Sequence, residues 1–321
     1  MTVTAFDYRS AGTRCAATHH APTPGPAAAG GRPVVVLAHG LAGTQDSGLA
    51  PFAAAFAAAG LHAVTIDYRG FGASDAAPGS ARQVVSIDAQ VADLHAAADA
   101  AKRLPGVDAD RLVLWGVSLA GGHVVRVATE RSDVAAVVSV VPLVDGLAAA
   151  RLAARHHRPA ALAASTGRGV ASTLGRRLGR GPRMIPVVAR PGEVGALTLE
   201  GAYDDYLAIA GSTWRNEIAA EVVMELGTRA PLKAAAALAG TPWLVQVADF
   251  DRSAPPQAAM KAAFAGRAHV RHYAGDHFDL FAGKPCHEAA ARHAVDFVAA
   301  HVLRPEERVR VEQSAYAAPS R

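Results

Sequence analysis

The most informative part of this sequence is the run Arg111-Leu112-Val113-Leu114-Trp115-Gly116-Val117-Ser118-Leu119-Ala120-Gly121-Gly122. Its first six residues are mostly apolar, as is typical of a buried strand in a parallel sheet, and a helical segment is expected over 119–129. Ser118 therefore falls at a sharp turn between strand and helix. Gly116 and Ala120 are small enough to let the two elements pack almost in contact, so the pattern predicts a serine hydroxyl presented at the end of a strand.

Strand-like and helix-like segments alternate on both sides of this turn. The expected strands are 33–38, 61–67, 111–116, 134–141, 242–247 and 268–273, and the expected helices are 48–59, 84–103, 119–129, 256–265 and 286–302. An order in which strands and helices alternate is typical of a mostly parallel central sheet with helices on both faces. The fold class is therefore α/β.

The alternation lapses over residues 143–238, where glycine, proline and arginine are frequent and helical periodicity is broken. We interpret this stretch as a mainly helical cap inserted into a core made of residues 1–142 and 239–304, followed by a polar tail over 305–321. Between Arg151 and Arg190 there are nine arginines, no Asp or Glu and no aromatic residue. A nucleic-acid interface would interleave basic with aromatic side chains, so the composition argues against one.

Composition limits the remaining classes of protein. Of the 321 residues, 51% are hydrophobic and 19% are charged, which excludes global disorder. Cys15 and Cys286 follow no metal-ligand spacing, and a reducing compartment is expected. Residues 1–10 have neither the basic start nor the apolar stretch of a signal peptide, and the longest apolar run, 134–144, is far shorter than the roughly 20 residues of a membrane span. We expect a soluble, cytoplasmic protein.

A serine nucleophile requires a general base and a carboxylate that orients the base. On a strand–turn–helix scaffold of this kind the chain order is serine, acid, histidine. His277 follows the last expected strand, and Asp251 follows the strand before it. Asp249 and Asp145, which also follow strands, remain alternatives for the acid; we favour Asp251 because the residues after it, up to Pro256, have the usual pattern of such a loop.

The run His39-Gly40-Leu41-Ala42-Gly43 follows the first expected strand. A tight turn here can direct the backbone N–H of Leu41 toward the oxyanion that forms when Ser118 attacks a carbonyl. The N–H of Leu119, at the start of a helix, is the second candidate donor. The alternative is an ordinary glycine-rich loop between a strand and a helix.

These motifs together resemble the α/β-hydrolase superfamily, and within it the serine-aminopeptidase-like and dienelactone-hydrolase-like branches. The resemblance spans about residues 33–300. The runs that carry it are 39–40, 67–74, 116–121, 249–251 and 275–277. It implies an α/β-hydrolase fold with Ser118 as nucleophile, His277 as base, Asp251 as acid, and Leu41 and Leu119 as oxyanion donors. Two positions depart from the usual pattern: Ala120 and Ala248 stand where glycine is frequent. Residues 141–146 and 211–217 are similar to a poorly characterised group that includes hydrolases of polyketide pathways.

The resemblance implies a hydrolase that cleaves a carboxylic ester or thioester through an acyl-enzyme, with neither metal nor cofactor. A peptidase or an acyltransferase on the same triad is the alternative, and a non-catalytic binding protein is a third. The expected partner is a small-molecule acyl substrate, and neither nucleic acid nor a membrane is expected. Whether the chain forms a homodimer is left undecided. The arginines of the cap are either a solvated surface or a means of attracting an acidic substrate.

Overall fold

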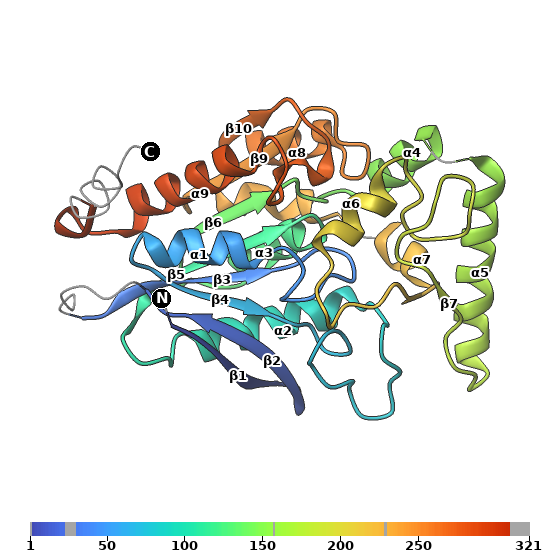
Figure 1. The fold of residues 1–321 in the computed structure, drawn as a ribbon, viewed down its shortest axis with the longest axis horizontal. Coiled ribbons are helices and arrows are strands. Elements are labelled where there is room, and N and C mark those ends of the chain that lie inside the picture. Colours follow the sequence, from blue (N-terminus) through green and yellow to red (C-terminus); the bar gives the residue numbers. More distant parts are fainter. Residues whose placement is uncertain (1, 23–29, 157, 228–229, 309–321) are drawn as a thin grey trace.

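An eight-stranded sheet forms the centre of the computed structural model, which describes residues 2–22, 30–156, 158–227 and 230–308 (Figure 1). The strand order is β1-β2-β4-β3-β5-β6-β9-β10. The bounds are β1 Val3–Ser10, β2 Thr13–His20, β3 Arg32–Ala38, β4 His62–Ile66, β5 Val107–Val117, β6 Val134–Val140, β9 Trp243–Ala248 and β10 His269–Tyr273. The strands from β4 to β10 pair in parallel, so the predicted α/β class and the mostly parallel sheet are confirmed.

The first two strands were not predicted from the sequence. β1 and β2 form an antiparallel hairpin, and β2 joins β4 antiparallel. β1 is the edge strand and leaves much of its surface exposed, so it lacks the apolar run that marks the inner strands. Salt bridges join the hairpin to its surroundings: Arg14 on β2 lies 2.9 Å from the carboxylate of Asp7 on β1 and 2.8 Å from that of Asp75.

Helices cover both faces of the sheet (Figure 1). One layer contains α1 Ala50–Ala58 and α9 His287–Val302, and the other contains α2 Ile87–Ala101, α3 Leu119–Thr129 and α8 Pro256–Ala265. Each of these is a helix expected from the sequence. The core lies between sheet and helices: Trp115 of β5 is fully buried, and its ring lies 4.9 Å from that of Phe52 on α1.

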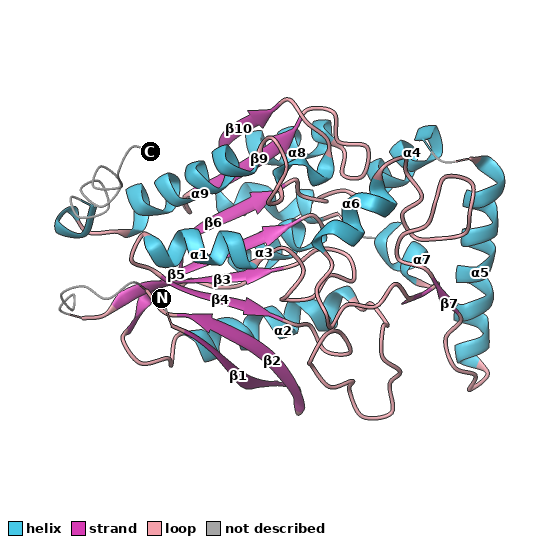
Figure 2. Cartoon of the chain, in the orientation of Figure 1, coloured by secondary structure: helices cyan, strands magenta, loops and turns pink. Residues whose placement is uncertain are grey.

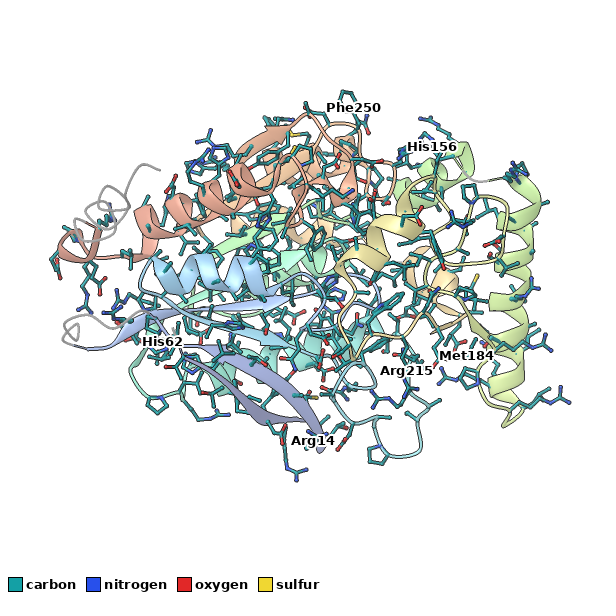
Figure 3. The ribbon with its side chains drawn as sticks, in the orientation of Figure 1. Arg14, His62, His156, Met184, Arg215 and Phe250 are labelled. Atoms are coloured by element: carbon teal, nitrogen blue, oxygen red, sulfur yellow. The ribbon has the colours of Figure 1, made fainter. Side chains whose placement is uncertain are left out.

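Between β6 and β9 the chain leaves the sheet and forms an insertion beyond the carboxyl ends of the parallel strands (Figure 2). Its elements are α4 Gly146–His156, α5 Pro159–Arg177, β7 Met184–Ile185, α6 Ala202–Ile209, β8 Ile218–Ala219, α7 Val222–Gly227 and the 3-10 helix η1 Pro231–Leu238. η1 packs back onto α3 and α8 of the core. The nine arginines between 151 and 190 are all exposed. Met184 and Arg215, labelled in Figure 3, also lie on the insertion.

The described part of the chain ends after α9, on the side of the amino ends of the parallel strands (Figure 1). Of the expected tail 305–321, residues 305–308 form a helical turn, and Glu307 accepts a hydrogen bond from Arg111 at 2.6 Å; residues 309–321 lie outside the described part. Among the described residues, no helix combines the length and the apolar character that crossing a bilayer requires.

Candidate active site

The register of the parallel strands brings the loops with candidate residues to one edge of the sheet. Pairs at or near the strand ends are Ala38 with Gly116, Val117 with Val140, Val140 with Gln246, and Ala248 with Tyr273. The loops after β3, β5, β9 and β10 therefore begin side by side, because the carboxyl ends of parallel strands lie along the same edge. These are the loops that carry Leu41, Ser118, Asp251 and His277.

Ser118 occupies a strained backbone conformation between β5 and α3, with φ 58° and ψ −119°. Such a conformation costs about 1–3 kcal/mol in a non-glycine residue and persists only where its surroundings enforce it. Here the Ser118 N–H donates to Val140 O at 2.9 Å, and the Ser118 carbonyl accepts from the N–H of Leu143 at 2.9 Å. A Cβ added to Gly116 would lie 2.3 Å from the carbonyl oxygen of Ala120, so glycine is required there, whereas the methyl group of Ala120 is accommodated in the core.

His277 forms a buried pair with Asp251, in which its Nδ1 lies 2.7 Å from Asp251 Oδ2. The other carboxylate oxygen, Oδ1, accepts backbone N–H bonds from Ser253 and Ala254, each at 2.7 Å. The Nδ1 proton therefore faces the carboxylate, and Nε2 carries the lone pair that could accept a proton. Burial by itself lowers the pKa of His277, but attraction to Asp251 and the hydrogen bond to it outweigh burial, and the pKa is raised above its usual value.

The two alternative acids lie elsewhere. Asp249 Oδ1 is 2.6 Å from Nδ1 of His272 in a partly exposed pair, so this carboxylate is engaged by another imidazole. Asp145 accepts the backbone N–H of Ala148 at 3.0 Å, in the first turn of α4. Asp251 is thus the one of the three that the structure places against His277.

Hydrogen bonds between the loop after β9, which carries Asp251, and the loop after β10, which carries His277, were not expected from the sequence. We call this contact the latch. Asp276, next to His277 in sequence, accepts the backbone N–H of Arg252 at 3.0 Å and its Nε–H at 2.6 Å. Asp276 also caps the short 3-10 helix η2 His277–Leu280. The sequence places both residue types beside the site, but only the folded chain shows that they hold the two loops together.

The turn after β3 lies directly against Ser118. A Cβ added to Gly40 would be 2.7 Å from Ser118 Cβ and 3.2 Å from its Oγ, so the Gly40–Leu41 peptide borders the serine. A Cβ on Gly43 would overlap the ring of His39. His39 is buried, and burial lowers its pKa to about 4, so the imidazole packs as a neutral ring beneath the turn. We refer to residues 39–47 as the oxyanion turn, after the role proposed below.

A cavity of about 270 Å³ lies in the insertion near these loops. Its walls are mostly small and aliphatic side chains from α4, α5, residues 195–199 and α7. Leu143, whose N–H bonds the Ser118 carbonyl, lines it, as do Arg252 and Ser253, which follow Asp251. Within the described residues, no group of three or more His, Cys, Asp or Glu side chains is arranged to hold a metal ion.

Comparisons with known proteins agree with this architecture. A family model described as serine aminopeptidase matches residues 30–188. The quorum-quenching protein AidA of Acinetobacter baumannii (strain MDR-ZJ06) is 33% identical over 269 residues, which are 83% of this chain and 86% of that protein. The polyketide transferase ATR5 of Stachybotrys chlorohalonatus (strain IBT 40285) is 28% identical over 163 residues, 50% of each chain.

Among solved structures, the α/β hydrolase GrgF from Penicillium sp. sh18 superposes with a TM-score of 0.76 at 20% identity, covering 95% of this chain and 100% of that one. Fold and relatives together define the class of this protein, an enzyme of the α/β-hydrolase type. The chain belongs to the α/β-hydrolase superfamily, as the sequence motifs predicted, and its residues 30–188 match the serine aminopeptidase model within it.

Proposed function

We propose that this enzyme is a serine hydrolase that cleaves a carboxylic ester or thioester through an acyl-enzyme on Ser118. The observation that carries the proposal is the buried hydrogen bond of 2.7 Å between His277 and Asp251, at the edge of the sheet where Ser118 is held in its strained turn. The backbone bonds to Asp251 and the latch through Asp276 fix the pair in one geometry, as general-base catalysis requires.

The reaction proceeds in two halves. His277 Nε2 takes the proton of Ser118 as Oγ attacks the carbonyl carbon, and the N–H groups of Leu41 and Leu119 donate to the oxyanion. His277 then gives the proton to the leaving alcohol or thiol as its bond to the acyl carbon breaks. In the second half His277 accepts a proton from water, the water oxygen attacks the acyl carbon, and Ser118 leaves with the proton as the acid is released.

The insertion over residues 143–238 acts in this proposal as a cap that forms part of the acyl site. The cavity of about 270 Å³ beside Leu143 is lined mainly by apolar groups, which favours an apolar acyl chain of modest size. Burial of each CH₂ in such a cavity contributes about 0.8 kcal/mol to binding.

Transfer of the acyl group to an acceptor other than water is a second candidate, because the relative ATR5 is named a polyketide transferase. The two activities share the acyl-enzyme and differ in what attacks it. Product analysis in the presence of added alcohols and amines separates them. A hydrolase releases mainly the free acid. A transferase gives a larger fraction of the new ester or amide than the molar ratio of acceptor to water predicts.

The proposal is tested by labelling and turnover. A fluorophosphonate should modify Ser118, as located by peptide mass spectrometry, and p-nitrophenyl esters of graded chain length should be hydrolysed. Ser118→Ala should abolish labelling and reduce kcat by several orders of magnitude with an unchanged circular dichroism spectrum. Label on another residue, or a variant within tenfold of the wild type, contradicts the assignment. Cleavage of aminoacyl arylamides in preference to esters indicates a peptidase.

A further inference from the structure

The oxyanion turn is contacted by the insertion as well as by the core. The hydroxyl of Tyr206, on α6, donates a hydrogen bond to the carbonyl oxygen of Leu41 at 2.6 Å. Tyr206 is buried, and burial raises the pKa of its hydroxyl well above the ordinary value, so the hydroxyl stays protonated and remains a donor. The bond is made to the residue whose N–H is the proposed oxyanion donor.

The ring of Tyr206 is held on two sides. It stacks on Trp214 at 5.0 Å between ring centroids with an interplanar angle of 28°, and it meets Phe278 edge-on at 5.7 Å. Phe278 directly follows His277. Aromatic contacts of this kind restrict the two torsions of the phenol, so its hydroxyl is aimed at Leu41 without further cost in side-chain entropy.

A second set of bonds joins the same two segments a few residues further on. The carboxylate of Asp46, in the oxyanion turn, accepts the N–H of Thr213 at 3.0 Å and the Thr213 hydroxyl at 2.8 Å. Gly211 donates its N–H to Ser47 Oγ at 3.2 Å, and a Cβ added to Gly211 would lie 2.1 Å from Asp46 Cγ. The run 211–217, singled out by its resemblance alone, therefore lies against the oxyanion turn.

The core holds the opposite side of the turn. Asp67, fully buried at the end of β4, accepts the backbone N–H of Gln45 at 2.7 Å and the side-chain amide of Gln45 at 3.0 Å. The segment 202–216 is itself anchored in the insertion, since Asn216 at its end exchanges hydrogen bonds with the backbone of Val188 at 2.9 Å and 3.0 Å. The turn is thus fixed between two supports, and the insertion supplies one of them.

We propose that Tyr206, backed by Trp214, is a positioning residue that sets the orientation of the oxyanion turn, with Thr213 as an auxiliary tie. The inference rests on the proposed function, because it gives a role to the Leu41 N–H. Donors stabilise an oxyanion only when they lie about 2.7–3.1 Å from it before the reaction begins, and a glycine-rich turn held by the core alone would sample other orientations. The insertion then completes the catalytic geometry in addition to covering it.

The test compares Tyr206→Phe with Tyr203→Phe, which removes a hydroxyl from the same helix at a ring that lies under Arg190. Loss of a whole oxyanion donor costs about 10²–10³ in kcat, and a donor that is only misoriented should cost less, about 10- to 100-fold. We expect that loss in Tyr206→Phe with KM within about twofold, since the transition state and not the bound ester uses the turn. Tyr203→Phe should retain the wild-type kcat.

Two further readouts separate positioning from a general structural role. A trifluoromethyl ketone, which forms an oxyanionic adduct with Ser118, should bind Tyr206→Phe more weakly by the same factor as the fall in kcat/KM. A thiono ester places a poorly accepting sulfur in the oxyanion site, so the ratio of oxo-ester to thiono-ester rates should fall in the variant. The His277 pKa in the pH profile should not move.

If Tyr206→Phe does not fold, Thr213→Val is the variant to measure. It removes the hydrogen bond from the Thr213 hydroxyl to Asp46 at nearly constant side-chain volume, and it should lower the ratio of oxo-ester to thiono-ester rates as Tyr206→Phe does. Wild-type kcat in Tyr206→Phe, or a loss of kcat with an unchanged ratio and unchanged ketone affinity, would overturn the proposal; for Thr213→Val an unchanged ratio does the same. Failure of the proposed function itself shows differently, as the absence of fluorophosphonate label on Ser118 of the wild type.

Discussion

Asp251→Asn should be far more damaging than Asp249→Asn, although the two changes are chemically identical and two residues apart. Asp251 Oδ1 accepts two backbone N–H bonds, from Ser253 and Ala254, and only an oxygen can accept them. The amide oxygen of the introduced asparagine must therefore take that position, which leaves its NH₂ group facing His277 Nδ1. His277 then has to carry its proton on Nε2, and the lone pair needed to deprotonate Ser118 is lost.

The expected magnitude follows from that tautomer. The same change in a well-studied serine protease leaves the geometry intact and lowers kcat about 10⁴-fold, equivalent to about 5.5 kcal/mol of transition-state stabilisation. Asp249 pairs with His272 where 41% of the Asp249 side chain and 48% of the His272 side chain are exposed, so its replacement should cost at most about 1 kcal/mol of stability and leave kcat unchanged.

The assay is kcat/KM on a short p-nitrophenyl ester from pH 5 to 9, with thermal melts of both variants. In the wild type the rate should rise with pH through a pKa above the usual value for histidine, because the pKa of His277 is raised and the base must be neutral. If Asp249→Asn is the more damaging variant, or if both stay within tenfold of the wild type, the assignment of Asp251 is wrong.

Three further changes test other parts of the structure. Gly116→Ala should destabilise the fold by about 1–3 kcal/mol and lower activity, since the new methyl group would meet the carbonyl of Ala120; urea unfolding measures it. Ala153→Phe, in the cavity wall, should lower kcat/KM for long-chain esters and leave acetyl esters unaffected, as a chain-length series will show. His62, whose pKa burial lowers to about 4, binds a proton more readily unfolded than folded, so stability should fall as pH drops from about 6.5 toward 4, and the melting temperature of His62→Gln should fall less over that range.

The sequence was sufficient for the inner sheet because its strands are buried on both faces. Residues such as Val34–Leu37 and Leu112–Trp115 are fully buried, and selection for burial leaves apolar runs that can be recognised without a structure. The hairpin β1–β2 could not be found in that way, because its edge strand is half solvated. There the exposed Asp7 and Arg9 alternate with the buried Tyr8 and Ser10, so the strand has no continuous apolar run.

For the candidate site, the sequence supports a prediction where chemistry dictates residue type and chain order. Ser118 and His277 were placed by that argument, whereas the choice between Asp251 and Asp249 depends on a backbone turn. The residues after Asp251 fold back so that Ser253 and Ala254 bind its Oδ1, and Oδ2 is then left facing His277. The sequence favoured Asp251 through the loop pattern up to Pro256, but the hydrogen bonds that distinguish it from Asp249 appear only in the folded chain.

The sequence did not reveal the features that depend on contacts between residues far apart in the chain. Tyr206 and Leu41 are 165 residues apart in sequence, and nothing in the composition of α6 indicates that one of its hydroxyls binds the oxyanion turn. The run 211–217 contains none of the residues proposed for the triad, so a search for a serine–acid–histidine order passes over it. Its glycine is explained by the close approach of Asp46, and its tryptophan by the ring of Tyr206. In the role we propose for Tyr206, a short motif outside the triad acts on catalysis through geometry, because it helps to hold a backbone donor in a different part of the chain.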